Sequence, residues 1–138
     1  MEQWKPILGY EGLYEVSSLG RVRSLPRWHN TRITGYIDKG RMLKPRFDSY
    51  GYQMVMLCKD KIQKNHLIHK LVAKAFIDNP NNYDSINHKD EDKTNNCVDN
   101  LEWCTRYYNN NYGTRNKRMS ETIRKKYADK RGVKDGIF

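Results

Sequence analysis

The sequence predicts an α+β fold, in which a small antiparallel β-sheet module precedes a strand–loop–strand–helix unit and a basic C-terminal helix. Three observations lead to this prediction. Short alternating segments separated by turn residues fill residues 14–66, the apolar period becomes helical from His69, and two short strands flank a long polar loop between residues 85 and 104. With 138 residues, the chain can form one compact domain or two small ones that share a core.

The first predicted element is a β-hairpin within residues 4–28. Tyr14–Ser17 alternates apolar and polar residues, Gly20 suits a turn, and the segment that follows alternates again. Arg21 and Arg23 share one face of the second strand. That face could lie against a DNA backbone or be solvated, and strand spacing alone favours neither.

Residues 29–40 are polar and contain two glycines, and we expect a loop there. Three short strands are expected within residues 41–69, separated by turns at Asp48–Gly51 and Lys59–Lys61. Antiparallel pairing of these strands is the simplest arrangement for such closely spaced segments.

A core helix is predicted from His69, because apolar residues then recur at helical spacing until the chain reaches Asn79 and Pro80. Short strands are expected at Ser85–Lys89 and Leu101–Cys104, on either side of a polar loop. The elements expected next are an N-cap at Thr105, a helix over Arg106–Asn111 and a last helix beginning near Ser120.

Net charge indicates a polyanionic partner. The formal net charge is +10 and the isoelectric point is about 9.6. Residues 85–105 carry five acidic and two basic side chains, whereas the segments before and after them are basic. An acidic centre between two basic arms is the pattern expected of a metal-dependent site held on DNA.

The three cysteines, Cys58, Cys97 and Cys104, are odd in number and lack C-x-x-C spacing. This argues against a disulfide framework and against a structural zinc site. We expect free thiols in a reducing cytoplasm. No apolar run approaches the length of a membrane span, and the polar first residues do not resemble a signal peptide.

Four segments in order resemble HNH homing endonucleases of the phage and intron-encoded type, over roughly residues 4–112. The first resembles their N-terminal DNA-binding module, the next two fit the connection that follows it, and the last fits the HNH nuclease finger, a ββα-metal unit. The segments are Trp4–Leu25, with the residues Gly9-Tyr10-Glu11-Gly12-Leu13-Tyr14-Glu15-Val16-Ser17; Leu43–Pro45 with Gly51-Tyr52; His69–Phe76; and Asn87–Asp90 with Lys93–Asn96 and Asn100–Trp103.

The resemblance implies a metal-dependent DNA endonuclease that leaves a 5′-phosphate and a 3′-hydroxyl. By resemblance, His88 is the general base that deprotonates water, and Asn100 holds the finger loop and the histidine. Asn87 and Asn109 would supply oxygens to one divalent cation, Mg²⁺ or Mn²⁺. Many relatives have Asp at the position of Asn87, so we expect weaker Mg²⁺ binding here.

Other polar residues near the finger have less specific interpretations. Asp90 could lend a charge to His88 through a water if both lie on one strand face, although this is the minority interpretation. Asn95 and Asn96 are more often loop-capping residues than metal ligands. His69 more often orders the start of the finger than contacts phosphate. Trp28 is the tryptophan we place nearest DNA.

Three functional segments are predicted. Residues 1–66 form a β-rich DNA-binding module, residues 67–112 form the nuclease finger with its preceding helix, and residues 113–138 form a basic helical DNA-binding tail. A monomer is expected to nick one strand of double-stranded DNA, with a dimer as the alternative. The competing function is a DNA-binding protein that keeps the scaffold but cleaves weakly or not at all. The predicted DNA contacts are Arg21, Arg23, Arg27, Lys44, Arg46, Lys117, Arg118, Arg124, Lys125 and Lys126.

Overall fold

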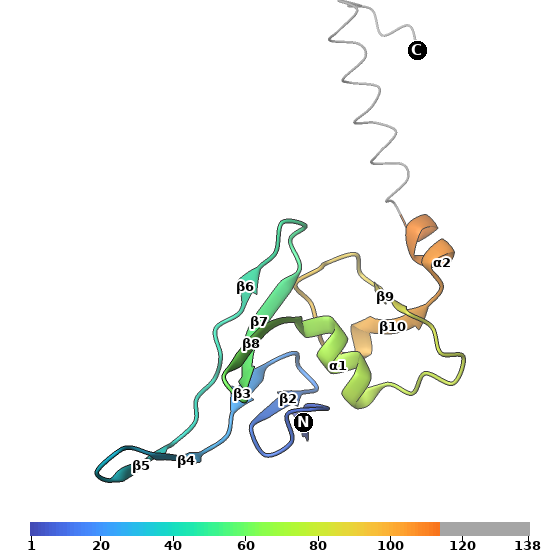
Figure 1. The fold of residues 1–138 in the computed structure, drawn as a ribbon. Helices are drawn as coiled ribbons and strands as arrows, with labels where there is room; N and C mark the ends of the chain where they lie inside the picture. Colours follow the sequence, from blue (N-terminus) through green and yellow to red (C-terminus); the bar gives the residue numbers. More distant parts are fainter. Residues whose placement is uncertain (114–138) are drawn as a thin grey trace, which may run out of the picture.

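The computed structural model describes residues 1–113 and has the predicted α+β fold, with small antiparallel sheets and two short α-helices (Figure 1). The expected helix near Ser120 lies outside the described residues, as do the five predicted DNA contacts from Lys117 onward. In residues 1–113 no helix is both long and apolar enough to cross a membrane.

The N-terminal sheet contains β1 (Trp4–Pro6), β2 (Tyr14–Ser17) and β3 (Val22–Ser24), in that order and antiparallel. The predicted hairpin is therefore confirmed as β2 and β3. Its turn contains Gly20, whose φ of 83° is a left-handed conformation that glycine adopts without steric cost. Val16 and Val22 face each other in the register and are fully buried, so this hairpin anchors the core.

The loop expected at residues 29–40 was wrong. β4 (Arg27–Asn30) and β5 (Gly35–Asp38) form a second hairpin, which projects from the rest of the molecule (Figure 1). Cross-strand packing holds it, because the rings of His29 and Tyr36 stack 5.1 Å apart. A Cβ at Gly35 would collide with the ring of Trp28, so only glycine leaves room for that ring. Cross-strand pairs of this kind cannot be predicted from the alternation of apolar and polar residues when the whole segment is polar.

The third sheet contains β6 (Arg46–Phe47), β7 (Gln53–Lys59) and β8 (Ile62–Leu67), with β7 in the middle. The strand expected over residues 41–46 is much shorter than predicted and begins at Arg46. Before it, Met42 makes a single bridge to Arg23 of β3. That bridge holds the segment before β6 against the first sheet. Lys59–Lys61 forms the expected turn, with positive φ angles at Asp60 and Lys61.

Helix α1 (Ile68–Phe76) follows β8 without a loop and starts one residue before the predicted position. Its buried face packs against strands from both halves of the described chain. The resulting hydrophobic core is continuous and includes the buried residues Ile7, Tyr14, Val16, Val22, Val55, Leu57, Ile68, Leu71, Val72, Ala73, Ile86 and Leu101.

The last described elements are β9 (Ser85–His88), a short 3₁₀ turn η1 (Val98–Asn100), β10 (Leu101–Cys104) and α2 (Arg106–Asn111). β9 and β10 pair antiparallel, and α2 follows at once. Thr105 is the predicted N-cap, since its side chain accepts a hydrogen bond from the Tyr108 amide. This strand–loop–strand–helix unit matches the prediction closely.

Candidate active site

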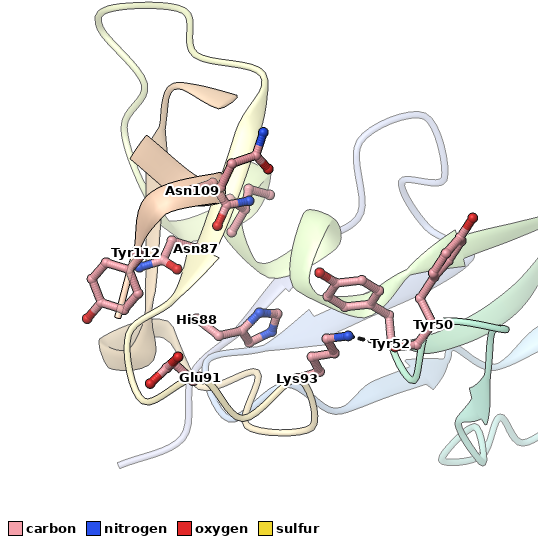
Figure 2. A pocket seen from close by; sticks show the side chains of 10 residues that line it. Tyr50, Tyr52, Asn87, His88, Glu91, Lys93, Asn109 and Tyr112 are labelled. Atoms are coloured by element: carbon pink, nitrogen blue, oxygen red, sulfur yellow. Dashed lines mark hydrogen bonds between the residues drawn. The ribbon is translucent and has the colours of Figure 1, made fainter. Parts of the chain in front are cut away.

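The ββα unit directs three of the predicted site residues toward one hollow. Asn87 and His88 are the last residues of β9, and Asn109 lies on α2. The hollow has a volume of about 280 Å³, and Figure 2 shows the side chains around it. Its lining residues are Tyr50, Tyr52, Ile86, Asn87, His88, Glu91, Lys93, Asn109, Asn110 and Tyr112. Sequence reasoning therefore identified three residues that the fold brings together.

His88 is 6% exposed, and its Nε2 lies 2.8 Å from Oδ1 of Asn96. Burial lowers the pKa of His88 below its ordinary value, and this outweighs the opposite effects of the Asn96 hydrogen bond and of nearby Asp90 and Asp92. The net direction favours a neutral imidazole near pH about 7. A neutral imidazole can accept a proton, as a general base must.

Asn87 is buried, and its Nδ2 donates a 2.8 Å hydrogen bond to Oε1 of Glu102 on the paired strand. Register explains the contact, because Asn87 stands opposite Glu102 in the β9–β10 ladder. With the nitrogen bound to Glu102, the Oδ1 atom is the end of the amide that can bind a cation. Asn109 provides a second amide at the same hollow.

Glu91 was missed by sequence reasoning as a site residue. It lies at the same hollow, three residues beyond His88, because its φ of 63° turns the chain back toward the site. A carboxylate and two amides form a set of hard oxygen donors, which suits Mg²⁺ or Mn²⁺ better than a thiophilic metal. Within residues 1–113 no three His, Cys, Asp or Glu side chains cluster as a metal site would require. The donor set therefore depends on the amide oxygens.

Asn100 supports the loop after β9. Its Oδ1 accepts from the Asp90 amide, and its Nδ2 donates to Oδ1 of Asp90 and to the carbonyl oxygen of Asn95. The Asn100 carbonyl oxygen also accepts from the Lys89 amide. These bonds fix the finger loop, whereas the His88 ring is hydrogen-bonded to Oδ1 of Asn96 and not to Asn100. The sequence suggested Asn96 as a loop cap or, less often, a metal ligand, and no spacing rule connects it to His88.

Asp90 lies in a turn after β9, because the strand ends at His88 rather than at Lys89. The strand-face argument for Asp90 was therefore wrong. Its carboxylate accepts from Asn95, Asn100 and the Asp92 amide. The Asn95 bond is the largest cause of a lowered Asp90 pKa. These hydrogen bonds indicate that the Asp90 carboxylate stabilises the loop after β9.

The predicted basic β-face is already paired with acidic side chains. Arg21 forms an ion pair with Glu2, and Arg23 forms one with Glu15. The Arg23 guanidinium also lies 3.9 Å from the centre of the Trp4 ring. Arg27 lies over the Tyr14 ring, Arg46 donates to Asn65, and Lys44 is exposed. Arg21 and Arg23 nevertheless keep 55% and 37% of their side-chain surface exposed, so the solvated-face and the DNA-facing interpretations both stay predictions.

The comparisons with known proteins fit this geometry. The NUMOD4 motif matches residues 2–58. The DNA endonuclease I-HmuI of Bacillus phage SP01 is 36% identical over 107 residues, which cover 78% of this chain and 55% of the relative. An HNH endonuclease of Acanthamoeba polyphaga mimivirus is 49% identical over 63 residues, 46% of this chain and 19% of the relative.

A solved structure agrees with the sequence matches. That structure, described as DNA binding and cleavage by the HNH homing endonuclease I-HmuI, superposes with a TM-score of 0.67 at 30% identity, over 92% of this chain and 66% of that one. The chain spans about half the length of the phage relative. The chain is therefore similar in sequence and in fold to HNH homing endonucleases, and it matches the NUMOD4 motif over residues 2–58.

Proposed function

We propose that this protein is a metal-dependent DNA endonuclease in which His88 is the general base. One observation carries the proposal: the imidazole of His88 and the amides of Asn87 and Asn109 line the same hollow. Phosphodiester hydrolysis needs a proton acceptor beside oxygen donors for a cation, and this hollow supplies both. The endonucleases named among the relatives support the same chemistry.

His88 would remove the proton from the attacking water. Burial supports this role, because the lowered pKa keeps the imidazole unprotonated near neutral pH. The Tyr52 ring lies beside the His88 ring, with 5.9 Å between the two centroids. Lys93, whose Nζ lies 4.9 Å from the centre of the Tyr52 ring, places a positive charge at the same hollow, where a phosphate would sit.

Asn87 and Asn109 would hold one divalent cation through their amide oxygens, and the Glu91 carboxylate lines the same hollow. When bound, such a cation offsets the negative charge that develops on the phosphate and its leaving oxygen. Glu102 contributes by holding the Asn87 nitrogen, which leaves the Asn87 oxygen as the end available to a cation. Amide ligands carry no formal charge, so the affinity for Mg²⁺ is expected to be modest.

The substrate would be double-stranded DNA, with one strand nicked by a monomer to leave a 5′-phosphate and a 3′-hydroxyl. A net charge of +10 supports a polyanionic substrate. In the described residues, Arg27, Lys44 and Arg46 are the predicted contacts that are not in acid–base pairs. The division into functional segments 1–66, 67–112 and 113–138 stays a prediction.

The test is conversion of supercoiled plasmid to open circle with Mg²⁺, with Mn²⁺ and with EDTA, for the unchanged protein and for His88→Ala. We expect metal-dependent nicking that His88→Ala abolishes while DNA retention on a gel persists. His29→Phe, on the projecting β4–β5 hairpin, removes a histidine but keeps a ring beside Tyr36, and it is the matched control. Cleavage by His88→Ala equal to that of the unchanged protein would refute the assignment of the base.

The second candidate is a DNA-binding protein that does not cleave efficiently. One observation favours it: the neutral amide of Asn87 is engaged with Glu102 instead of presenting a carboxylate to a cation. Retention of DNA without nicking, on a panel of phage DNAs and with either metal, would support this function. A panel is needed because a single plasmid can lack the cleavage site.

A further inference from the structure

His88 is the first member of a buried hydrogen-bond chain that ends in the N-terminal half of the protein. Its Nε2 lies 2.8 Å from Oδ1 of Asn96, and Nδ2 of Asn96 donates across 3.0 Å to Oε1 of Gln53 on β7. Asn96 is only 3% exposed, so water has little access to compete for either end of the amide. Forty-three residues separate Asn96 from Gln53 in sequence.

The backbone around Asn96 is also held by the turn between β2 and β3. The Val98 amide donates to the Ser18 carbonyl oxygen across 2.9 Å. A Cβ added to Gly20 would stand 2.8 Å from Cβ of Asn96, closer than real Cβ contacts, so the turn lies directly against Asn96. Gln53 and this turn both belong to the segment matched by the NUMOD4 motif, residues 2–58. The N-terminal half therefore contacts Asn96 through both its side chain and its backbone.

The direction of the two hydrogen bonds, His88 to Asn96 and Asn96 to Gln53, determines which ring nitrogen of a neutral His88 carries the proton. Gln53 presents an oxygen, so the Asn96 nitrogen faces Gln53 and the Asn96 oxygen faces His88. An amide oxygen only accepts, which means that Nε2 of a neutral His88 must carry the proton. Nδ1 is then left with a lone pair, and only that nitrogen can take a proton from water.

We propose that Asn96 and Gln53 are positioning residues that hold His88 in the Nε2–H tautomer, so that the N-terminal module completes the catalytic centre. The inference rests on the proposed function for its kinetic consequence, but the tautomer itself can be observed without catalysis. A purely structural network would fill the same space and would leave the position of the proton unchanged when Gln53 loses its oxygen.

Four variants of the full-length protein distinguish a positioning role of Asn96 and Gln53 from a purely structural one. Gln53→Met keeps the length of the side chain and removes the acceptor for Asn96. Gln53→Glu restores an acceptor at the same place. Gln63→Met is the control: it makes the same glutamine-to-methionine substitution on the neighbouring strand β8, where Gln63 is exposed. Asn96→Ala removes the partner of His88 altogether. Circular dichroism and thermal melting identify any variant that fails to fold.

The first readout is the two-bond ¹H–¹⁵N correlation of the His88 ring, recorded without DNA or metal above about pH 8, where histidine is neutral. We expect the Nε2–H pattern in the unchanged protein, in Gln53→Glu and in Gln63→Met, and a mixture of tautomers in Gln53→Met and Asn96→Ala. An Nδ1–H pattern in the unchanged protein would overturn the inference. So would an Nε2–H pattern that persists in both folded Gln53→Met and Asn96→Ala.

The second readout is nicking kinetics. We expect kcat to fall about tenfold in Gln53→Met, the order of effect of one misplaced hydrogen bond, with KM unchanged and kcat largely recovered in Gln53→Glu. An equal loss in Gln63→Met would overturn the specific role of Gln53. If the unchanged protein nicks no DNA, the proposed function fails, and the tautomer measurement still decides whether Asn96 and Gln53 position His88.

Discussion

The rings of His69 and His88 lie edge to face, with 5.1 Å between their centroids. His69 comes from the start of α1 and His88 from the end of β9, so the core helix carries one imidazole directly to the other. Burial, together with the proximity of His88, lowers the pKa of His69 to about 4. Within residues 1–113, its Nδ1 is the buried side-chain nitrogen or oxygen that has no hydrogen-bond partner.

This pair predicts that acid destabilises the protein through His69. Folding depresses the pKa of His69, so the unfolded chain binds more protons than the folded one between pH 6.5 and about 4. Stability should therefore fall as the pH decreases through this window, by about 2 kcal/mol at about pH 5. His69→Phe should lose most of this dependence and be no less stable at neutral pH, because it removes an unpartnered polar atom.

The measurement is urea unfolding at neutral pH and at about pH 5 for the unchanged protein, for His69→Phe and for His29→Phe on the projecting hairpin. The control should keep the full acid sensitivity. An equal acid sensitivity in His69→Phe would show that protonation of other groups, such as the carboxylates, controls acid unfolding.

Replacing Asn87 by Asp should have two opposing effects. A carboxylate binds Mg²⁺ more strongly than an amide, so metal affinity and nicking should rise. However, the introduced carboxylate would face Glu102 where Asn87 now donates a hydrogen bond, which should cost about 1–3 kcal/mol of stability without metal. The double variant Asn87→Asp with Glu102→Gln restores a donor and should keep the affinity gain without that loss.

Isothermal titration with Mg²⁺ and thermal melting with EDTA measure the two effects separately. Glu102→Gln alone is the control for the change at Glu102. If the double variant binds Mg²⁺ no more tightly than the unchanged protein, Asn87 is not a metal ligand.

Gly20→Ala tests the contact between the β2–β3 turn and Asn96. Gly20 and Gly12 both have positive φ angles, so alanine at either should cost about 1 kcal/mol of backbone strain. Only at Gly20 would the new Cβ meet Asn96, whereas nothing lies within 4 Å of a Cβ at Gly12. Gly20→Ala should therefore lose about 1–3 kcal/mol more than Gly12→Ala and nick more slowly. Equal unfolding free energies, measured by urea titration, would contradict the contact.

Salt dependence should report the phosphate contacts. The logarithm of the DNA association constant should fall linearly with the logarithm of salt concentration, with a slope of about −0.9 per contacted phosphate. Lys44→Ala should reduce that slope by about one such unit, because Lys44 is exposed and in no ion pair among the described residues. Fluorescence anisotropy with labelled duplex DNA measures the slope. An unchanged slope would remove Lys44 from the interface.

Much of the fold could be predicted from local sequence. The strands at Tyr14–Ser17 and Leu101–Cys104, the helix over Arg106–Asn111 and its cap at Thr105 depend on alternation, helical spacing and short-range hydrogen bonds. The β4–β5 hairpin could not be predicted in the same way. Its stability depends on cross-strand pairs, such as His29 with Tyr36, and a polar sequence carries no periodic pattern that predicts such pairs.

The sequence by itself predicted three side chains that meet at the hollow, namely His88, its neighbour Asn87 and the later Asn109, and it showed a basic composition suited to a polyanionic partner. Only the tertiary structure decided what surrounds them. It turned Glu91 toward the hollow, placed Asn96 against His88 and brought Gln53 and the Gly20 turn to Asn96. Local spacing governs contacts within one turn or strand pair, whereas these partners meet because a shared core packs distant segments together.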